Sequence, residues 1–378
     1  MNSPNYQQCT RCIMDNKSDD TITFDESGHC NYCSNALQIK NKTYFPNEEG
    51  REKLNNLLTR LKKENKHHSY DCVMGISGGL DSSYLAYLGS VHWGLRILAV
   101  HIDDGFNTEI SEKNIAKIAE FPNFDLKIIK PDPVQYKELT KAYMKAGVPN
   151  LAVPQDNVLF SSLYKFMKEN KLKTFLSGGN YALECILQSG NTHDAYDLRN
   201  LKDINKKFGK SSISNLPLLS SLKRDIDTYI FKIESARPLN YIEYNRDRAM
   251  KELSDYCDFE YYGSKHLENA LTKFIQQYWF YHKFNVDKRT SHLSSMIVSD
   301  QMTREEAQKQ YQLPLYNHED MQKTVTLVLN KLGISEKEFL HIMAEPGRQH
   351  SDYKTSIYSK VKSHSMKALR NFLSKNTQ

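Results

Sequence analysis

Residues 73–88 constrain the fold of this chain more than any other stretch, because a strand, a glycine turn and a helix follow one another there. The apolar run at 73–76 predicts a buried strand, and apolar spacing predicts a helix over 82–90. Between them, two adjacent glycines after Ser77 let a ligand approach the backbone without obstruction by a Cβ atom. The unpaired amides and the positive dipole end of the following helix favour an anion. We therefore expect the turn to cradle an anion with several oxygens, such as pyrophosphate.

One acidic side chain stands beside this expected cradle. Asp81 would repel phosphates unless a cation lay between them, which indicates a Mg²⁺ ligand. The loop lacks the Gly-Lys-[Ser/Thr] end of a Walker A motif. The competing interpretation is an ordinary strand–turn–helix rich in small residues. The residues predicted to bind the anion and its accompanying cation are Ser77, Gly78, Gly79, Asp81, Ser82 and Ser83.

The Ser-Gly-Gly-x-Asp-Ser order of this loop resembles the cradle of the ATP pyrophosphatases, the PP-loop family. The resemblance implies an enzyme that cleaves ATP between its α and β phosphates and uses the AMP to activate an oxygen. It also implies ATP and Mg²⁺ as cofactors.

Strands and helices alternate along the first half of the chain, which predicts a doubly wound parallel α/β sheet. Ligands of such sheets bind beyond the carboxyl ends of the strands, so the loops at 101–107 and 177–181 should join the cradle in one crevice. The expected strands lie at 73–76, 97–102, 126–129 and 174–177, and the expected helices at 82–90, 109–120, 134–146 and 157–168.

Two of these strand-end loops carry further candidates. Asp103 and Asp104 follow a buried strand, and one of them could bind Mg²⁺ or the ribose hydroxyls, with a helix cap or turn as the alternative. Gly179 and Asn180 in the third loop are predicted to contact the nucleotide.

Four of the seven cysteines form two Cys-x-x-Cys pairs separated by seventeen residues, Cys9/Cys12 and Cys30/Cys33. Two such turns aim four sulfurs at one point, which predicts a closed, structural Zn²⁺ site in a small ribbon. Two disulfides and an iron–sulfur cluster are the alternatives. Cys72, Cys185 and Cys257 are isolated and are expected to be inert buried thiols.

The chain divides into three expected regions: a zinc ribbon at 1–45, the PP-loop domain at 46–198 and a helical substrate or partner region at 199–378. The net charge of +6 is mild for 378 residues, which makes a nucleic-acid partner unlikely. No apolar run approaches the length of a membrane span, and the polar opening residues do not resemble a signal peptide. We therefore expect a cytoplasmic protein.

Further motifs narrow the resemblance to the bacterial N-acetyl sugar amidotransferases of the PP-loop superfamily. This group is associated with surface polysaccharides and with pseudaminic and legionaminic acids. The resemblance implies conversion of a sugar N-acetyl group into an acetamidino group through an O-adenylyl imidate. The motifs lie at 9–15, 101–107, 177–182, 262–268, 287–295 and 301–307.

The same motifs supply the remaining candidate residues. Lys288 and Arg289 are expected to contact phosphate and to take part in catalysis with Asp81, the alternative being surface charge. The predicted substrate-binding residues are Tyr181, Glu184, Lys265, His266 and Glu268.

Ammonia is the reactant for which the sequence offers no source, since no glutaminase signature is present. The resemblance implies a separate glutaminase subunit, together with a barrel-shaped synthase-like companion. Two other functions stay open. A PP-loop tRNA thiolation enzyme would need a catalytic cysteine pair, with Cys72 and Cys185 as the available thiols. An ATP-binding scaffold subunit would need no turnover.

Overall fold

The computed structural model describes residues 6–263 and 267–362 of the chain. Its centre is a parallel sheet with strand order β3-β2-β1-β4-β5. Strands β2 and β3 lie on one side of β1, and β4 and β5 lie on the other, so the strand order reverses at β1. The carboxyl end of β1 is therefore the switch point where ligands of such sheets bind. The strands are β1 (Cys72–Gly75), β2 (Ile97–Ile102), β3 (Phe124–Ile129), β4 (Thr174–Leu176) and β5 (Glu234–Ala236).

The predicted parallel α/β fold is thus confirmed, and its four expected strands are present with ends shifted by up to two residues. The fifth strand, β5, was not predicted. It has three residues, of which Glu234 and Ser235 are exposed, so no apolar pattern marks it. It also comes from the region expected to be helical, although the proposed domain boundaries themselves stay predictions.

Both faces of the central strands β1 and β2 are buried, which explains why these strands read as largely apolar runs. Val73 and Leu98 belong to one core cluster with Leu163 of α6. Met74 and Ala99, one residue further along each strand, belong to the opposite cluster. Helices in the first half are α1 (Asn31–Thr43), α2 (Glu48–Glu64), α3 (Leu80–Tyr87), α4 (Glu109–Ala119), α5 (Pro133–Ala146), α6 (Val153–Glu169) and α7 (Tyr181–Glu184).

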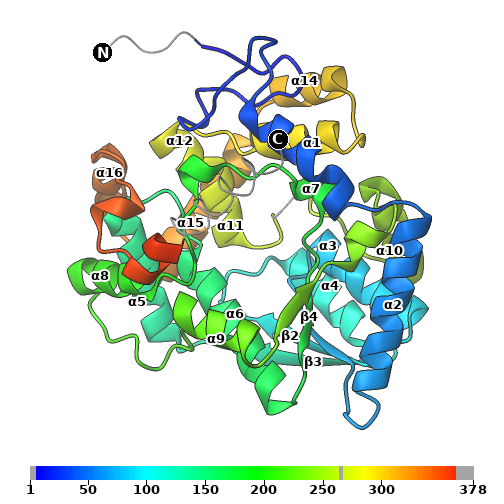
Figure 1. The fold of residues 1–378 in the computed structure, drawn as a ribbon. Helices are drawn as coiled ribbons and strands as arrows, with labels where there is room; N and C mark the ends of the chain where they lie inside the picture. Colours follow the sequence, from blue (N-terminus) through cyan, green and yellow to red (C-terminus); the bar gives the residue numbers. More distant parts are fainter. Residues whose placement is uncertain (1–5, 264–266, 363–378) are drawn as a thin grey trace.

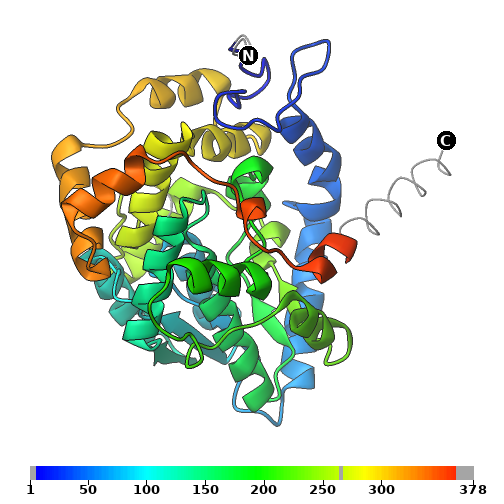
Figure 2. The ribbon, with the colours of Figure 1, turned by 90° about the vertical axis from the view of Figure 1, so that its left-hand side faces the viewer.

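The second half of the chain is mainly helical and packs around another core cluster, centred on Phe274 and Trp279. Its last helices lie along the side of the molecule that faces the viewer in Figure 2. Within the part of the chain that the structure describes, no helix has the length and apolarity of a membrane span. The helices are α8 (Leu198–Phe208), α9 (Ser221–Tyr229), α10 (Arg246–Cys257), α11 (Ala270–Lys273), α12 (Phe280–Phe284), α13 (Arg289–Val298), α14 (Arg304–Gln312), α15 (His318–Leu332) and α16 (Glu336–Ala344).

Short turns of other helix types complete the fold, and η4 links α11 to α12 without a break in the helical path. These turns are η1 (Leu88–His92), η2 (Ser189–Asn191), η3 (Pro238–Tyr241), η4 (Phe274–Trp279) and η5 (His350–Asp352).

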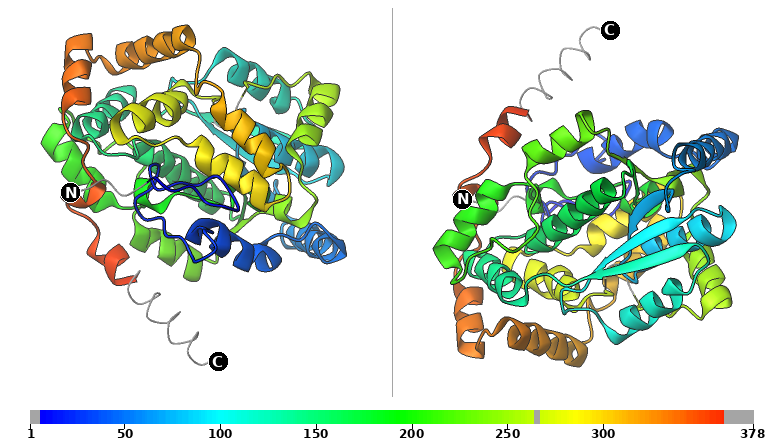
Figure 3. Two further views of the ribbon diagram at one scale, coloured as in Figure 1. Left: turned by 90° about the horizontal axis from the view of Figure 1, so that it is seen from above. Right: turned by 90° about the horizontal axis from the view of Figure 1, so that it is seen from below.

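The cysteine-bearing N-terminal segment lies far from the sheet, beside α1 and α14 at the top of Figure 1. Seen from above, it crosses over the helices of the second half (Figure 3). The Ile13 amide donates to Ser294 Oγ of α13 at 3.1 Å, and Arg304 of α14 donates to the Cys12 carbonyl at 3.1 Å. The segment is therefore anchored by helices that lie about 280 residues away in sequence.

Candidate active site and cysteine cluster

The turn after β1 has the conformation that its glycines permit. Gly78 has φ +75°, and a Cβ atom there would lie 2.7 Å from the Ser111 carbonyl oxygen. Ser111 Oγ donates to the Ser77 carbonyl at 2.9 Å, so α4 holds the turn in place. A side chain at position 78 would be strained and would also push α4 away.

The loop after β4 closes the other side of the same turn. A Cβ atom at Gly178 would lie 3.1 Å from the carbonyl carbon of Asp81 and from the Ser82 nitrogen. The β4 loop therefore touches the start of α3. The predicted convergence of these two strand-end loops is confirmed.

Two side chains from the 262–268 segment reach into the turn. Glu268 Oε1 accepts a hydrogen bond from Ser77 Oγ at 3.1 Å, and the Leu80 amide donates to the Tyr262 hydroxyl at 2.8 Å. A Cβ atom at Gly79 would lie only 2.5 Å from Glu268 Oε1. The absence of a side chain at Gly79 therefore makes room for this carboxylate.

Asp81 is oriented by a buried tyrosine. The Tyr244 hydroxyl donates to Asp81 Oδ1. Burial raises the pKa of Tyr244 well above its ordinary value, and the nearby Asp81 charge raises it further. Tyr244 therefore stays protonated and keeps donating to Asp81.

These groups border a cavity of about 660 Å³, which is in the usual range for small-ligand sites. Apolar side chains form much of its wall, among them Met250, Leu293, Met296 and Leu313. Its polar and charged lining residues are Ser77, Asp81, Ser82, Glu184, Arg246, Tyr261, Tyr262, Glu268, Gln277, Arg289, His292 and Gln310.

Many of the predicted site residues meet at this cavity, although they come from four separate parts of the chain. Gly78 and Ser83 shape the turn without lining the cavity, and the Ser83 hydroxyl donates to the Gly79 carbonyl at 2.7 Å. Lys265 and His266 lie outside the described residues. The predicted residues that line the cavity are Ser77, Gly79, Asp81, Ser82, Gly179, Glu184, Glu268 and Arg289.

Two predicted residues of the third loop make structural contacts. The Asn180 side chain caps α7 by accepting from the Leu183 amide at 2.9 Å. The Tyr181 hydroxyl donates to the Ala36 carbonyl of α1 at 2.7 Å, and its ring stacks on Tyr44. Neither residue lines the cavity, so the proposed nucleotide contact of Asn180 and substrate contact of Tyr181 find no support in this arrangement.

Asp103 and Lys288 also lie outside the cavity lining. Asp103 pairs with Lys130 at 3.0 Å and accepts from the Gly105 amide at 3.1 Å. The Lys288 ammonium lies over the Phe280 ring, 5.5 Å from its centre, and burial lowers the pKa of Lys288 to about 8. Their predicted roles, a cation or ribose contact and a phosphate contact, are likewise not supported by these positions.

Sequence reasoning missed several residues that border the cavity. His292, Leu293 and Met296 follow the predicted Arg289 at helical spacing and share one face of α13 with it, a signal that could have been found. Tyr262 lines the cavity, and Tyr244 orients Asp81 from outside the lining. Neither carried such a signal, because they contact residues 182 and 163 positions earlier in the chain.

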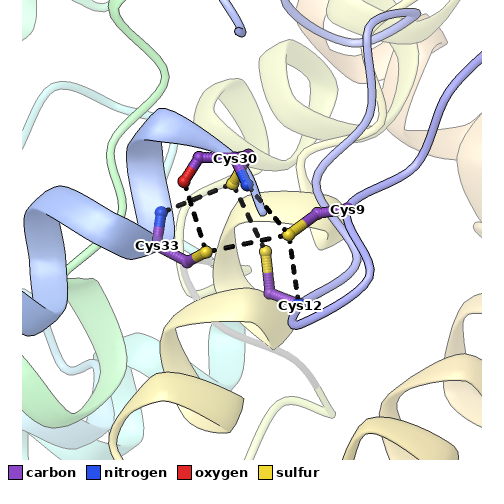
Figure 4. A group of neighbouring side chains, drawn as sticks. All are labelled: Cys9, Cys12, Cys30 and Cys33. Atoms are coloured by element: carbon purple, nitrogen blue, oxygen red, sulfur yellow. Dashed lines mark hydrogen bonds between the residues drawn. The ribbon is translucent and has the colours of Figure 1, made fainter. Parts of the chain in front are cut away.

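The four predicted metal-binding cysteines come together in the N-terminal segment (Figure 4). Their sulfur atoms lie within 4.8 Å of one another, and all four residues are fully buried. The Cys9–Cys33 and Cys12–Cys30 sulfur pairs are 3.7 and 3.6 Å apart. Sulfurs around a tetrahedral Zn²⁺ with bonds of about 2.3 Å would be about 3.8 Å apart, so the group fits zinc.

The surroundings of the cysteines suit a structural metal site. Cys30 is the N-cap of α1, and the Cys33 amide donates to its sulfur at 3.4 Å. Arg11 donates to the Cys33 sulfur at 3.7 Å and brings a positive charge to the thiolates. With four protein ligands, the site has no open position for a substrate.

The fold and the site together define a parallel α/β protein with a turn of serine and glycine residues at the switch point of its sheet, beside a cavity. Residues 268–367 match the family described as "LPS biosynthesis protein WbpG-like, C-terminal domain". The comparison with curated proteins gives no match.

Among solved structures, the chain is similar to an NMN synthetase from Francisella tularensis, with 15% identity over 71% of this chain and 98% of that one and a TM-score of 0.34. It is also similar to an NAD⁺ synthetase from Burkholderia pseudomallei, with 14% identity over 60% and 94% of the two chains and a TM-score of 0.29. At such low TM-scores, neither likeness bears on the reaction of this chain.

Proposed function

We propose that this chain is an ATP-dependent, AMP-forming amidotransferase that converts the N-acetyl group of a bacterial surface sugar into an acetamidino group. The observation that carries the proposal is the composition of one cavity. Its lining combines residues of the Ser-Gly-Gly-x-Asp-Ser turn with Glu268, Arg289 and His292 from the segment that matches the WbpG-like domain. The cavity thus joins a nucleotide-type element to an element found in lipopolysaccharide biosynthesis proteins.

The proposed chemistry has two steps. The amide oxygen of the acetamido group attacks the α-phosphorus of ATP, and pyrophosphate leaves with the electron pair of the broken P–O bond. Ammonia then adds to the carbon of the O-adenylyl imidate, and AMP departs to leave the amidine. The first step is needed because an amide is a poor electrophile whose oxygen does not leave unaided.

In this proposal the chain mainly aligns the reactants and neutralises charge. The hydroxyls of Ser77 and Ser82 and the turn amides bind the departing pyrophosphate. Arg289, whose guanidinium Asp287 fixes through contacts of 2.8 to 3.2 Å, faces the same cavity. The apolar wall excludes water, which would otherwise hydrolyse the imidate.

Mg²⁺ would be held at Asp81, where it would neutralise phosphate charge. The residues present fit such an ion, because Asp81 is an ionisable carboxylate at the mouth of the cradle and its orientation is fixed by Tyr244.

We further propose that ammonia comes from a separate glutaminase subunit, accompanied by a barrel-shaped synthase-like protein. No cysteine is among the described residues that line the cavity, so a glutamine-cleaving thiol is not provided there. Cys185 donates to the Ser295 carbonyl, and burial raises its pKa to about 11. The same facts disfavour the tRNA thiolation alternative, which needs a reactive thiol at the cradle.

The test is to incubate the chain with ATP, Mg²⁺, ammonium and a panel of acetamido sugars. We expect AMP and pyrophosphate to form only with a suitable sugar, and mass spectrometry should find that sugar with one oxygen replaced by NH. With glutamine as the only nitrogen source, the isolated chain should be inactive. Formation of ADP and orthophosphate, or full turnover with glutamine, would contradict the proposal.

A further inference from the structure

The carboxylate of Glu268 occupies a place where a negative charge hinders phosphate binding. Its Oε1 accepts from Ser77 Oγ at 3.1 Å, inside the predicted phosphate cradle. The side chain fits there because Gly79 has no Cβ atom, which would come within 2.5 Å of that oxygen. A carboxylate at this position therefore requires a function that a neutral hydroxyl or amide side chain could not perform.

Backbone contacts on both sides fix this position. The Glu268 carbonyl accepts from both the amide and the hydroxyl of Thr108, at 3.1 and 3.0 Å. Two residues later, the Ala270 amide donates to the Phe106 carbonyl at 2.7 Å. The loop after β2 thus holds residues 268–270 from outside the cradle, and Glu268 is not a surface side chain that happens to fold inward.

The second carboxylate oxygen of Glu268 lacks a partner. Only 8% of the residue is exposed, and its Oε2 is buried without a hydrogen bond among the residues that the structure describes. Buried carboxylate oxygens are normally paired, because their desolvation is costly. Glu268 also lines the cavity. A ligand of positive charge in the cavity would satisfy this oxygen.

We infer that Glu268 and Asp81 together hold the divalent cation that accompanies the nucleotide, with Glu268 supplying a ligand from outside the Ser-Gly-Gly-x-Asp-Ser motif. The inference rests on the proposed function, because it takes the cradle to bind a nucleotide polyphosphate. Oxygen ligands from carboxylates are what Mg²⁺ and Mn²⁺ prefer. With a cation between them and the phosphates, the two acids aid nucleotide binding instead of opposing it.

A further electrostatic observation agrees with a shared ion. Both Glu268 and Asp81 act on the hydroxyl of Tyr262, whose pKa is raised mainly by burial and further by these two charges. Both carboxylates line the cavity, and Tyr262 accepts from the amide of Leu80, the neighbour of Asp81 at the start of α3.

The experiment measures Mn²⁺ binding by electron paramagnetic resonance, with α,β-methylene-ATP as the uncleavable nucleotide. It compares the wild-type chain with Glu268→Gln and with Glu260→Gln, which makes the same chemical change at an exposed site outside the cavity. We expect Glu268→Gln to weaken Mn²⁺ binding in the nucleotide complex at least tenfold, since loss of even a ligand's hydrogen-bond partner typically costs about 10- to 100-fold. Glu260→Gln should match the wild type.

Nucleotide binding without a divalent cation gives the second readout, measured by calorimetry in the presence of EDTA. Glu268→Gln should bind α,β-methylene-ATP as tightly as the wild type or more tightly, because a repelling charge is gone. Unchanged Mn²⁺ affinity in Glu268→Gln would overturn the inference and leave Glu268 as a mere obstruction of the cradle. If Glu268→Gln does not fold, Glu268→Asp decides the Mn²⁺ measurement, because its shorter side chain keeps the charge but does not reach the ion.

The two proposals fail differently in this experiment. A wild-type chain that binds no α,β-methylene-ATP with Mn²⁺ contradicts the proposed function. A wild-type chain that binds both, together with a Glu268→Gln variant of equal Mn²⁺ affinity, contradicts only the role of Glu268.

Discussion

The cysteine cluster and the proposed phosphate cradle are both built from polar groups close together, yet they differ in where those groups find their partners. The four cysteine sulfurs face one another, are fully buried and leave no open position. The cradle opens on a cavity of about 660 Å³, and a buried oxygen of Glu268 beside it has no partner among the described residues. A closed set of ligands suits a structural ion, whereas an open and incompletely paired set suits a substrate that comes and goes.

The two sites also differ in how much of the rest of the fold each one needs. The ligands of the cluster come from two short turns within 25 residues, whose sequence spacing already sets their geometry. The cradle needs α4, the β4 loop and the 262–268 segment to complete it. Damage to the cluster should therefore affect folding, and damage to the cradle should affect binding and catalysis.

The largest effect is expected from loss of a cysteine ligand. Cys12→Ser should remove bound zinc and lower the free energy of unfolding by more than about 4 kcal/mol, because loss of a structural metal is among the most damaging changes. Metal analysis and thermal denaturation measure both effects. The control is Cys257→Ser, since Cys257 is half-buried and lies outside the cluster. A Cys12→Ser variant that keeps its metal and its melting temperature would show that the cluster is not a structural zinc site.

Next in size is the replacement of the cradle acid. Asp81→Asn should lower kcat about 10²–10³-fold, the usual cost of removing one charge-stabilising group at a reaction centre. Melting should change little, because the asparagine oxygen can still accept from Tyr244. Asp255→Asn, on the exposed face of α10, should have normal kcat and serves as the matched control. Equal kcat values in both variants would remove Asp81 from the proposed mechanism.

A smaller effect is expected from adding one methyl group to the cradle. Gly79→Ala places a Cβ 2.5 Å from Glu268 Oε1, which forces the carboxylate away from Ser77. Binding of α,β-methylene-ATP with Mn²⁺ should weaken about tenfold, or about 1.4 kcal/mol. Gly75→Ala is the control at the end of β1, since its Cβ would meet only leucine methyl groups at 3.8 Å. Titration calorimetry measures the nucleotide affinity of both variants. Equal affinities would show that the contact between Gly79 and Glu268 is unimportant.

The smallest effect concerns Lys288, which lies outside both sites. Its pKa in the folded chain is lowered from 10.5 to about 8 by burial, so between these two values the unfolded chain binds more protons than the folded one. The free energy of unfolding should therefore rise as the pH increases from about 8 to 10.5. Lys288→Met should remove this rise and stabilise the protein at pH 7 by about 1 kcal/mol.

Chemical denaturation at several pH values measures this dependence, with Lys323→Met at the exposed surface as the control. Nucleotide affinity gives a separate readout for the phosphate contact predicted from the sequence. Normal affinity in Lys288→Met would exclude that contact, and a loss of affinity with no change in the pH dependence would restore it.

Much of the architecture could be predicted because its signals are local. The parallel sheet followed from apolar runs alternating with helical patterns, and the strand at 97–102 was placed with both ends correct. The cysteine cluster followed from two Cys-x-x-Cys pairs, since each turn fixes its own geometry. The turn between β1 and α3 followed from its two glycines in the same way, whereas phosphate binding there stays a prediction. Strand β5 was missed because three residues, two of them exposed and polar, carry no periodic signal.

The sequence by itself therefore determined which short segments could bind an ion, bind a phosphate or form a strand of the sheet. Each of these properties depends on neighbours a few residues apart. Tertiary structure alone decided which distant side chains complete the site. It turned Tyr181 toward α1 and set Lys288 against an aromatic ring, and it brought Glu268 to Ser77 across 191 residues. No local pattern encodes such contacts, because they depend on how the packed elements meet and on which polar atoms that packing leaves without a partner.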